Sequence, residues 1–92
     1  PNKEGPRKRF IGMEAQNPHT LVFYESPYRL VPFLNNAIEV LGDRRAVLAN
    51  DLTKKFERIT RGTLSEILGE LEEAPIKGEF VICIAGFEEA VT

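Results

Sequence analysis

Apolar residues follow two spacings along this chain, one typical of short strands and the other of amphipathic helices. Residues 19–25 are apolar, β-branched and aromatic and lie between two prolines, which predicts a strand buried on both faces. Ser26 stands before Pro27 as a helix cap stands before a first-turn proline, and apolar residues then recur at helical spacing up to Gly42. We therefore expect a helix that is kinked or tightened near Pro32 and ends at Gly42.

The second half of the chain carries two more strands, a hairpin and a strong helix start. Residues 46–49 predict a second buried strand, and residues 57–61 alternate as a half-exposed strand does, so a hairpin is expected between them. Thr63 and Glu66 have the spacing of a capping box ahead of an apolar stripe, which predicts another helix. Residues 80–85 form the most continuous apolar run and predict the central strand.

The first eighteen residues begin with a basic cluster. Its members are Lys3, Arg7, Lys8 and Arg9. Such a cluster is typical either of a segment that contacts phosphate or of a solvated linker. Residues 7–16 then predict a helix with Phe10, Met13 and Ile11 on one side, ended by Asn17 and Pro18. We expect a basic linker and first helix over residues 1–18 and one α/β domain over residues 19–92, as a fragment of a larger protein.

The order of these elements is a helix, then β-α-β, a hairpin link and α-β. Helical crossovers favour parallel strands, whereas the hairpin requires an antiparallel pair. The order therefore predicts an α/β fold with a mixed sheet of about four to five strands covered by helices. A ferredoxin-like α+β arrangement, in which crossovers are split around another strand, fits the same order.

Composition narrows the class of protein. Hydrophobic residues make up 42% of the 92 residues and charged residues 28%, which is typical of one globular domain. The formal net charge of −2 does not indicate a nucleic-acid-binding protein, so any basic surface has to be confined to one part of the molecule. One cysteine, Cys83, reads as a small buried hydrophobe, and the single histidine, His19, gives no support for a zinc site or a Ser-His-Asp triad. No apolar run is long enough for a membrane span, so we expect a cytoplasmic protein with no membrane partner.

Two polar clusters fall where strands are expected to end, which is where α/β sheets usually bind ligands. The first cluster comprises Glu25, Ser26, Tyr28 and Arg29. The second comprises Asp51, Thr53, Lys54, Lys55, Glu57 and Arg61. Each cluster is also compatible with a plain solvated turn.

Three ordered segments, VFYESPYRL, NDLTKKFERITRGTL and KGEFVICIAG, resemble the second domain of ribosomal RNA methyltransferases in the tetrapyrrole methylase family. The resemblance implies a two-domain enzyme with S-adenosylmethionine bound in a cleft shared with a missing N-terminal domain. It implies a cytidine ribose 2′-hydroxyl in small-subunit ribosomal RNA as the acceptor, and a possible homodimer. The fragment alone is then expected to be inactive.

The resemblance implies the cofactor-binding residues, and the chemistry of methyl transfer to a ribose in RNA suggests roles for others. The expected cofactor-binding residues are Tyr24, Glu25, Leu52, Thr53, Phe80 and Val81. Glu25 is a candidate general base with Arg29 beside it, because a ribose hydroxyl has to lose its proton. The expected substrate-binding residues are Arg7, Lys8, Arg9, Ser26, Tyr28, Lys54, Glu57 and Arg61. Tyr24, Tyr28 and Phe56 are candidates for stacking on an extruded base.

The chain departs from the family pattern at three positions. Tyr28 stands where the family usually has histidine, and Asn50 and Asp51 stand where it has an Arg-Glu pair. Asparagine cannot reproduce a charged bidentate contact, which makes the substrate less certain than the family.

Two other functions stay open for this chain. One is a tetrapyrrole carbon methyltransferase domain, as in corrinoid or siroheme synthesis, and the other is a non-catalytic ferredoxin-like interaction module.

Overall fold

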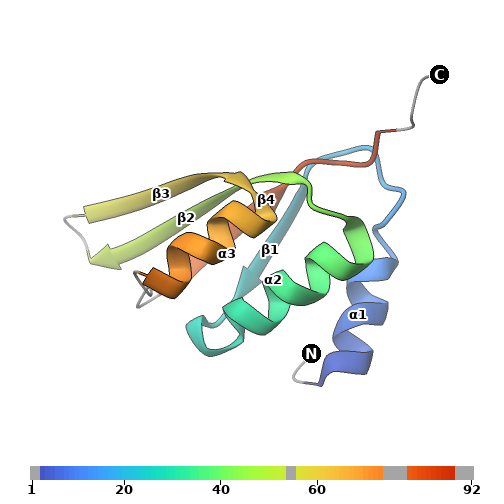
Figure 1. The fold of residues 1–92 in the computed structure, drawn as a ribbon, viewed down its shortest axis with the longest axis horizontal. Helices are drawn as coiled ribbons and strands as arrows, with labels where there is room; N and C mark the ends of the chain where they lie inside the picture. Colours follow the sequence, from blue (N-terminus) through green and yellow to red (C-terminus); the bar gives the residue numbers. More distant parts are fainter. Residues whose placement is uncertain (1–2, 54–55, 74–78, 89–92) are drawn as a thin grey trace.

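The computed structural model describes residues 3–53, 56–73 and 79–88. Three helices and four strands lie in this part of the chain (Figure 1). In chain order they are α1 (Glu4–Gly12), β1 (Leu21–Glu25), α2 (Pro27–Leu41), β2 (Arg45–Thr53), β3 (Phe56–Thr63), α3 (Leu64–Glu73) and β4 (Glu79–Ile84). The predicted order of elements is therefore confirmed, and the domain has the α/β composition expected of it.

The four strands form one sheet in the order β1-β4-β2-β3, with every neighbouring pair antiparallel. The prediction of parallel neighbours is wrong because each helical crossover leaves a gap that one antiparallel strand fills. β1 and β2 do run in the same direction, but β4 lies between them. From β1 onward the elements follow the β-α-β-β-α-β order of the split arrangement. The central position predicted for residues 80–85 is confirmed, since β4 pairs on both sides.

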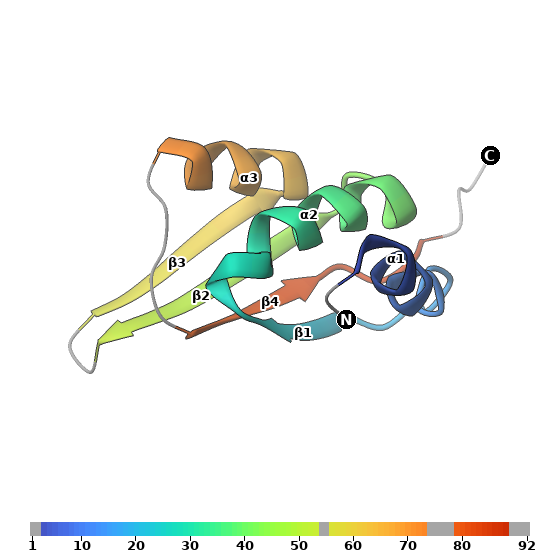
Figure 2. The same cartoon turned by 90° about the horizontal axis from the view of Figure 1, so that it is seen from below.

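All three helices cover the same face of the sheet, and the core lies between them and that face (Figure 2). The strands alternate accordingly, with every second side chain directed into the core. The rings of Phe10 and Phe33 pack on Phe23, with centroids 6.1 and 5.0 Å from it. The largest fully buried apolar side chains are Ile11, Leu30, Phe33, Leu34, Leu48, Leu64, Ile67, Ile82 and Ile84.

The opposite face of the sheet is open in the described part of the chain. In β1, Leu21 and Phe23 are buried, whereas Val22 is 53% exposed and Tyr24 is 80% exposed. Cys83 is half-buried on this open side, and not a fully buried residue as predicted. The expectation that residues 19–25 are buried on both faces is therefore wrong. The apolar residues of the strand are present on both faces, but helices cover only one of them.

The first helix begins and ends earlier than the predicted range 7–16. Arg7 and Ile11, one turn apart, are its buried residues, while Phe10 is half-exposed and Met13 is 80% exposed. The Arg7 guanidinium donates a hydrogen bond of 2.7 Å to the Asn36 side chain on α2. α1 is therefore anchored to α2, and Ile11 belongs to the common core.

Helix α2 begins and ends where predicted, with Pro27 as its first residue and Leu41 as its last. Gly42 follows its last turn with a φ of 87°, a conformation that favours glycine, and its N–H bonds to the carbonyl of Ile38. Ser26 occupies the N-cap position, but its side chain makes no capping hydrogen bond. Instead the Arg29 N–H bonds to the Ser26 carbonyl at 2.9 Å, which tightens the first turn ahead of Pro32 as expected.

The capping box predicted at the start of α3 is confirmed. The Thr63 N–H donates to Glu66 Oε1 at 3.0 Å, and the Glu66 N–H donates to Thr63 Oγ1 at 3.3 Å. The Thr63 backbone N–H thereby lowers the pKa of Glu66. Asp43 Oδ1 also accepts the Ser65 N–H at 2.7 Å, a contact that was not predicted from the sequence. The loop before β2 is thus tied to the start of α3.

Candidate functional site

The two polar clusters predicted from the sequence share one edge of the sheet. β1 and β2 run in the same direction on either side of β4, so their carboxyl ends lie together. Phe80 of β4 is the direct partner of Glu25 on one side and of Asn50 on the other. The end of β1 and the last part of β2 are therefore two strands apart. We refer to this edge as the strand-tip edge.

The covered face of the sheet becomes polar as it approaches this edge. The first of three successive rows across the four strands is Leu21, Ile84, Ala46 and Gly62; the next is Phe23, Ile82, Leu48 and Thr60; and the last is Glu25, Phe80, Asn50 and Arg58. Three of the four side chains in the last row are polar or charged, whereas the first row is apolar throughout. Asn50 is 1% exposed although it is polar. Polar groups are seldom placed under a helix layer without a partner or a function.

Asn50 and Arg58 were not assigned as site residues from the sequence. Both have the strand parity of buried positions, since Ala46, Leu48 and Asn50 alternate on β2. A polar residue at a core-facing parity is the signal that identifies Asn50. Asn50 takes part in this alternation only because β2 continues to Thr53, beyond the predicted end at residue 49.

Glu25, Ser26 and Arg29 form a connected group at the tip of β1. The Arg29 Nε lies 3.4 Å from Glu25 Oε1 and 3.3 Å from Ser26 Oγ. The Ser26 N–H also donates to Glu25 Oε1, at 3.4 Å. The Glu25 side chain is only 11% exposed, whereas that of Arg29 is 42% exposed. The carboxylate is thus held in a partly enclosed position by contacts that all reach one of its two oxygens.

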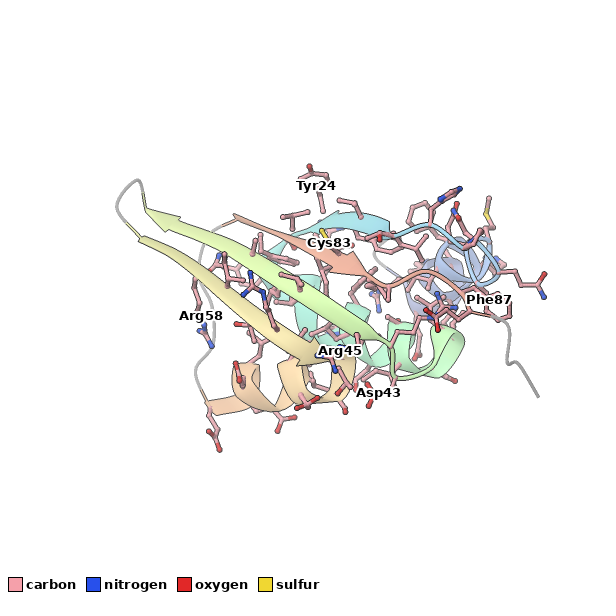
Figure 3. All side chains as sticks on the ribbon, turned by 90° about the horizontal axis from the view of Figure 1, so that it is seen from above. Tyr24, Asp43, Arg45, Arg58, Cys83 and Phe87 are labelled. Atoms are coloured by element: carbon pink, nitrogen blue, oxygen red, sulfur yellow. The ribbon has the colours of Figure 1, made fainter. Side chains whose placement is uncertain are left out.

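Two tyrosines project from the same region into solvent. Tyr24 points away from the helices, on the open face of the sheet (Figure 3). Its partner on β4 is Val81, which is half-buried. Tyr28, in the first turn of α2, is 94% exposed. Exposed aromatic rings of this kind offer flat apolar surfaces to a planar ligand.

Several other residues that were predicted to bind the cofactor or the substrate add no described side chain to the exposed surface of the strand-tip edge. Phe80 is 5% exposed and belongs to the core, so its side chain does not form part of an exposed ligand surface. The backbone near the end of β2 pairs with β3 through Asp51 with Glu57 and Thr53 with Phe56, with an irregular register between them. Lys54 lies outside the described residues, as do the side chains of Leu52, Thr53, Phe56 and Glu57.

The basic segment predicted to contact RNA is partly used for packing. Arg7 is 5% exposed and bonded to Asn36, which leaves its guanidinium no open surface for a phosphate. We therefore correct its assignment as a substrate-binding residue. Lys8 lies 2.8 Å from Glu39 on α2, and this hydrogen bond raises the pKa of the Lys8 ammonium. Arg9 is exposed.

Arg61 is exposed on the open face, in the row that contains Val22, Cys83 and Val47. Arg45, which sequence reasoning did not assign, is exposed at the start of β2 and has the strand parity of the same face. Glu25 belongs to the covered face by strand parity, so Arg61 and the Glu25 group occupy different sides of the sheet.

Metal-ligand clusters and membrane-spanning helices are both absent from residues 3–53, 56–73 and 79–88. These residues contain no group of three or more His, Cys, Asp or Glu side chains placed to hold a metal ion. Within the same residues, no helix has the length and apolar character needed to cross a bilayer.

No protein-family model matches the chain, but curated relatives do. It is 48% identical over 86 residues, 94% of its length, to ribosomal RNA small subunit methyltransferase I of Streptococcus pyogenes serotype M1. It is 41% identical over 91 residues to the protein of that name from Micromonospora olivasterospora, and 39% identical over 80 residues to that from Bacillus subtilis (strain 168). These matches cover 98% and 87% of the chain, respectively. The chain spans only 30%, 29% and 27% of the three relatives' own lengths.

Proposed function

We propose that this chain is the second domain of a ribosomal RNA methyltransferase. Over the segment that it shares with its curated relatives, the chain belongs to the ribosomal RNA small subunit methyltransferase I family. The observation that carries the proposal is the likeness over nearly the whole chain to proteins of that name. The proposed reaction transfers a methyl group from S-adenosylmethionine to the 2′-hydroxyl of a cytidine in small-subunit ribosomal RNA. The strand-tip edge supplies one half of the donor cleft, and the remaining part of the longer polypeptide supplies the other.

The residues at the strand-tip edge suit one side of an S-adenosylmethionine site. Tyr24 and Val81 are partners on adjacent strands and offer apolar surface to an adenine ring. Glu25, which follows Tyr24, offers a carboxylate to hydroxyl or ammonium groups. Backbone groups at Leu52 and Thr53 lie farther along the same edge. When bound, the cofactor supplies an electrophilic methyl group on a sulfonium centre.

Glu25 is the proposed general base for the acceptor hydroxyl. Its Oε1 already receives the Ser26 N–H and faces the Arg29 guanidinium. Oε2 is therefore the oxygen that we assign to the proton of the ribose hydroxyl. Arg29 and Ser26 act as positioning residues, because they fix the direction of the carboxylate. Holding reactants in attack geometry is the larger part of the task, worth roughly 7 to 11 kcal/mol.

Exposed cations around this edge are the proposed RNA contacts. Arg29 is available in the described residues, and Lys54 follows the end of β2 in the sequence. Arg61 lies on the opposite face of the sheet and does not belong to this set. Arg9 and the half-exposed Lys8 extend the set on α1, whereas Arg7 is withdrawn from it. Contacts of this kind neutralise phosphates and make binding weaken with added salt. Tyr28 is the proposed stacking platform for a base.

The test is methyl transfer by the full-length protein. Radiolabelled S-adenosylmethionine is offered with isolated small ribosomal subunits or with a porphyrinogen, and the labelled product is identified. We expect label in the ribosomal RNA at the ribose of one cytidine, seen as resistance of the adjacent phosphodiester to alkaline cleavage. The isolated chain serves as the control and is expected to transfer no methyl group.

Label in the porphyrinogen would favour the tetrapyrrole methyltransferase over the RNA enzyme. Transfer to neither substrate, together with no binding of the cofactor by the full-length protein, would favour the non-catalytic interaction module. Either result contradicts the proposed function.

A further inference from the structure

The face of the sheet opposite the helices is a continuous apolar surface, here called the open face. Its apolar side chains are Val22, Tyr24, Val47, Ala49, Ile59, Val81 and Cys83. They occupy two adjacent rows that cross all four strands. Val22, Tyr24 and Ile59 are 53%, 80% and 51% exposed. Figure 2 shows that no described helix lies on this side.

The pattern of the strands indicates that this face is normally covered. An antiparallel sheet with one face in water usually alternates apolar residues with polar ones. β1 and β4 do not, because valine, tyrosine and cysteine take the solvent-facing positions between core residues. Contiguous exposed apolar surface of this kind marks an interaction site in soluble proteins.

The character of the open face favours a protein partner. Its surface is mostly aliphatic, with one thiol and a single aromatic ring at one corner, whereas single-stranded nucleic acids bind through several stacked rings and a track of cations. The two described cations of this face, Arg45 and Arg61, border a shallow hollow of 280 Å³ that Val47 and Cys83 also line. The covering surface is therefore apolar over most of its area and acidic where it meets these arginines.

We propose that the open face is the docking surface for another part of the same polypeptide. The inference rests on the portion of the proposed function that makes this chain one domain of a longer enzyme, and not on the methyl transfer itself. The chain spans about 30% of the length of its curated relatives, so most of such a protein lies outside the shared segment and is available in cis. A covering segment held in the same chain has a high effective concentration, which a separate partner lacks.

The docking surface and the candidate site meet at Tyr24. This residue lies on the open face, and the next residue, Glu25, is directed to the covered face at the strand-tip edge. A segment docked on Val22, Val47, Ile59 and Cys83 therefore borders the proposed donor cleft and leaves Tyr24 and Val81 to the cofactor.

Cys83 serves as a native probe because it is the only cysteine of the chain and lies in the middle of the open face. Alkylation by iodoacetamide is followed by mass spectrometry of the peptide that contains it. We expect alkylation to be at least about tenfold slower in the full-length protein than in the isolated chain, since the covering segment has to open first. Equal rates would overturn the proposal.

A pair of valine variants in the full-length protein gives a second, independent readout. Val22→Asp places a charge on the open face, whereas Val31→Asp places one on the exposed side of α2, where Val31 is 41% exposed. We expect Val22→Asp to raise the alkylation rate of Cys83 toward that of the isolated chain, and Val31→Asp to leave the rate unchanged. Identical behaviour of the two variants would count against a covered face, even if the isolated chain does not fold.

Two further outcomes would replace the proposed occupant. Protection of Cys83 that grows with protein concentration would indicate a second copy of the chain, and protection that requires added RNA would indicate a nucleic-acid surface. Neither readout depends on cofactor or activity. Failure of the docking proposal is therefore distinguishable from failure of the proposed methyl transfer.

Discussion

Replacing Glu25 with glutamine in the full-length protein is expected to lower the rate of ribosomal RNA methylation by about 10²- to 10⁴-fold. Glutamine keeps the size of the side chain and an acceptor oxygen for the Ser26 N–H, but it cannot take a proton from the ribose hydroxyl. Glutamine also keeps an acceptor oxygen for a hydroxyl group of the cofactor, so the affinity for S-adenosylmethionine, measured by calorimetry, is expected to fall much less than the rate. The effect should therefore appear mainly in kcat.

A matched substitution separates this effect from a general loss of charge. Glu88 is exposed after β4, at the other end of the sheet from the strand-tip edge, so Glu88→Gln should retain the wild-type rate. Wild-type activity of Glu25→Gln would remove Glu25 from the role of base. A parallel fall in cofactor affinity would instead make it a binding residue.

Substitution of Gly86 by alanine is expected to lower the free energy of unfolding by about 1–3 kcal/mol or more, as overpacking does in a well-packed region. A Cβ atom at this position would overlap the carbonyl group of Pro18 and come within 2.5 Å of the His19 carbonyl oxygen. These are backbone atoms, so no side-chain rotation relieves the overlap. The neighbouring Phe87 N–H bonds to the Asn17 carbonyl at 2.8 Å, which holds the two segments together.

Gly69 offers the matched control in the middle of α3. A Cβ atom built there has no neighbour within 4 Å, and alanine is the better helix former. Gly69→Ala should therefore raise the free energy of unfolding by about 0.5–1 kcal/mol. Both values are measured by urea denaturation of the isolated chain. A Gly86→Ala variant as stable as the wild type would show that residues 85–87 do not pack tightly against residues 17–19.

Features with a local cause were predictable from the sequence. The apolar spacing of α2, its end at Gly42 and the capping box of Thr63 and Glu66 each depend on residues within a few positions of one another. The central place of β4 was predicted from the length of its apolar run, which is typical of a strand with neighbours on both sides.

Features that depend on distant contacts were not predictable. The sheet order inserts β4 between β1 and β2, and nothing near either strand encodes that choice. Arg7 looked like one member of an exposed basic cluster until its contact with Asn36, 29 positions away, placed it in the interior. The capping contact from Asp43 to Ser65 likewise spans 22 positions. The apolar residues of β1 predicted burial on both faces, whereas the described helices cover only one of them.

The candidate site was predictable in part. Sequence reasoning identified the tip of β1 and the end of β2, and the register places these two segments at one edge. It did not identify Asn50 and Arg58, because their row is defined by pairing across the sheet. It also grouped Arg61 with the strand-tip residues, whereas strand parity assigns Arg61 to the open face.

The claim on which the rest depends is that the end of β1 and the end of β2 together form one wall of a methyl-donor site. Ultraviolet crosslinking of radiolabelled S-adenosylmethionine to the full-length protein, followed by mapping of the labelled peptides, tests it most directly. We expect label within residues 22–29 or 49–53, competed away by unlabelled S-adenosylhomocysteine. Label confined to peptides outside these two ranges, such as α1 or residues 85–88 at the other end of the sheet, would contradict the claim.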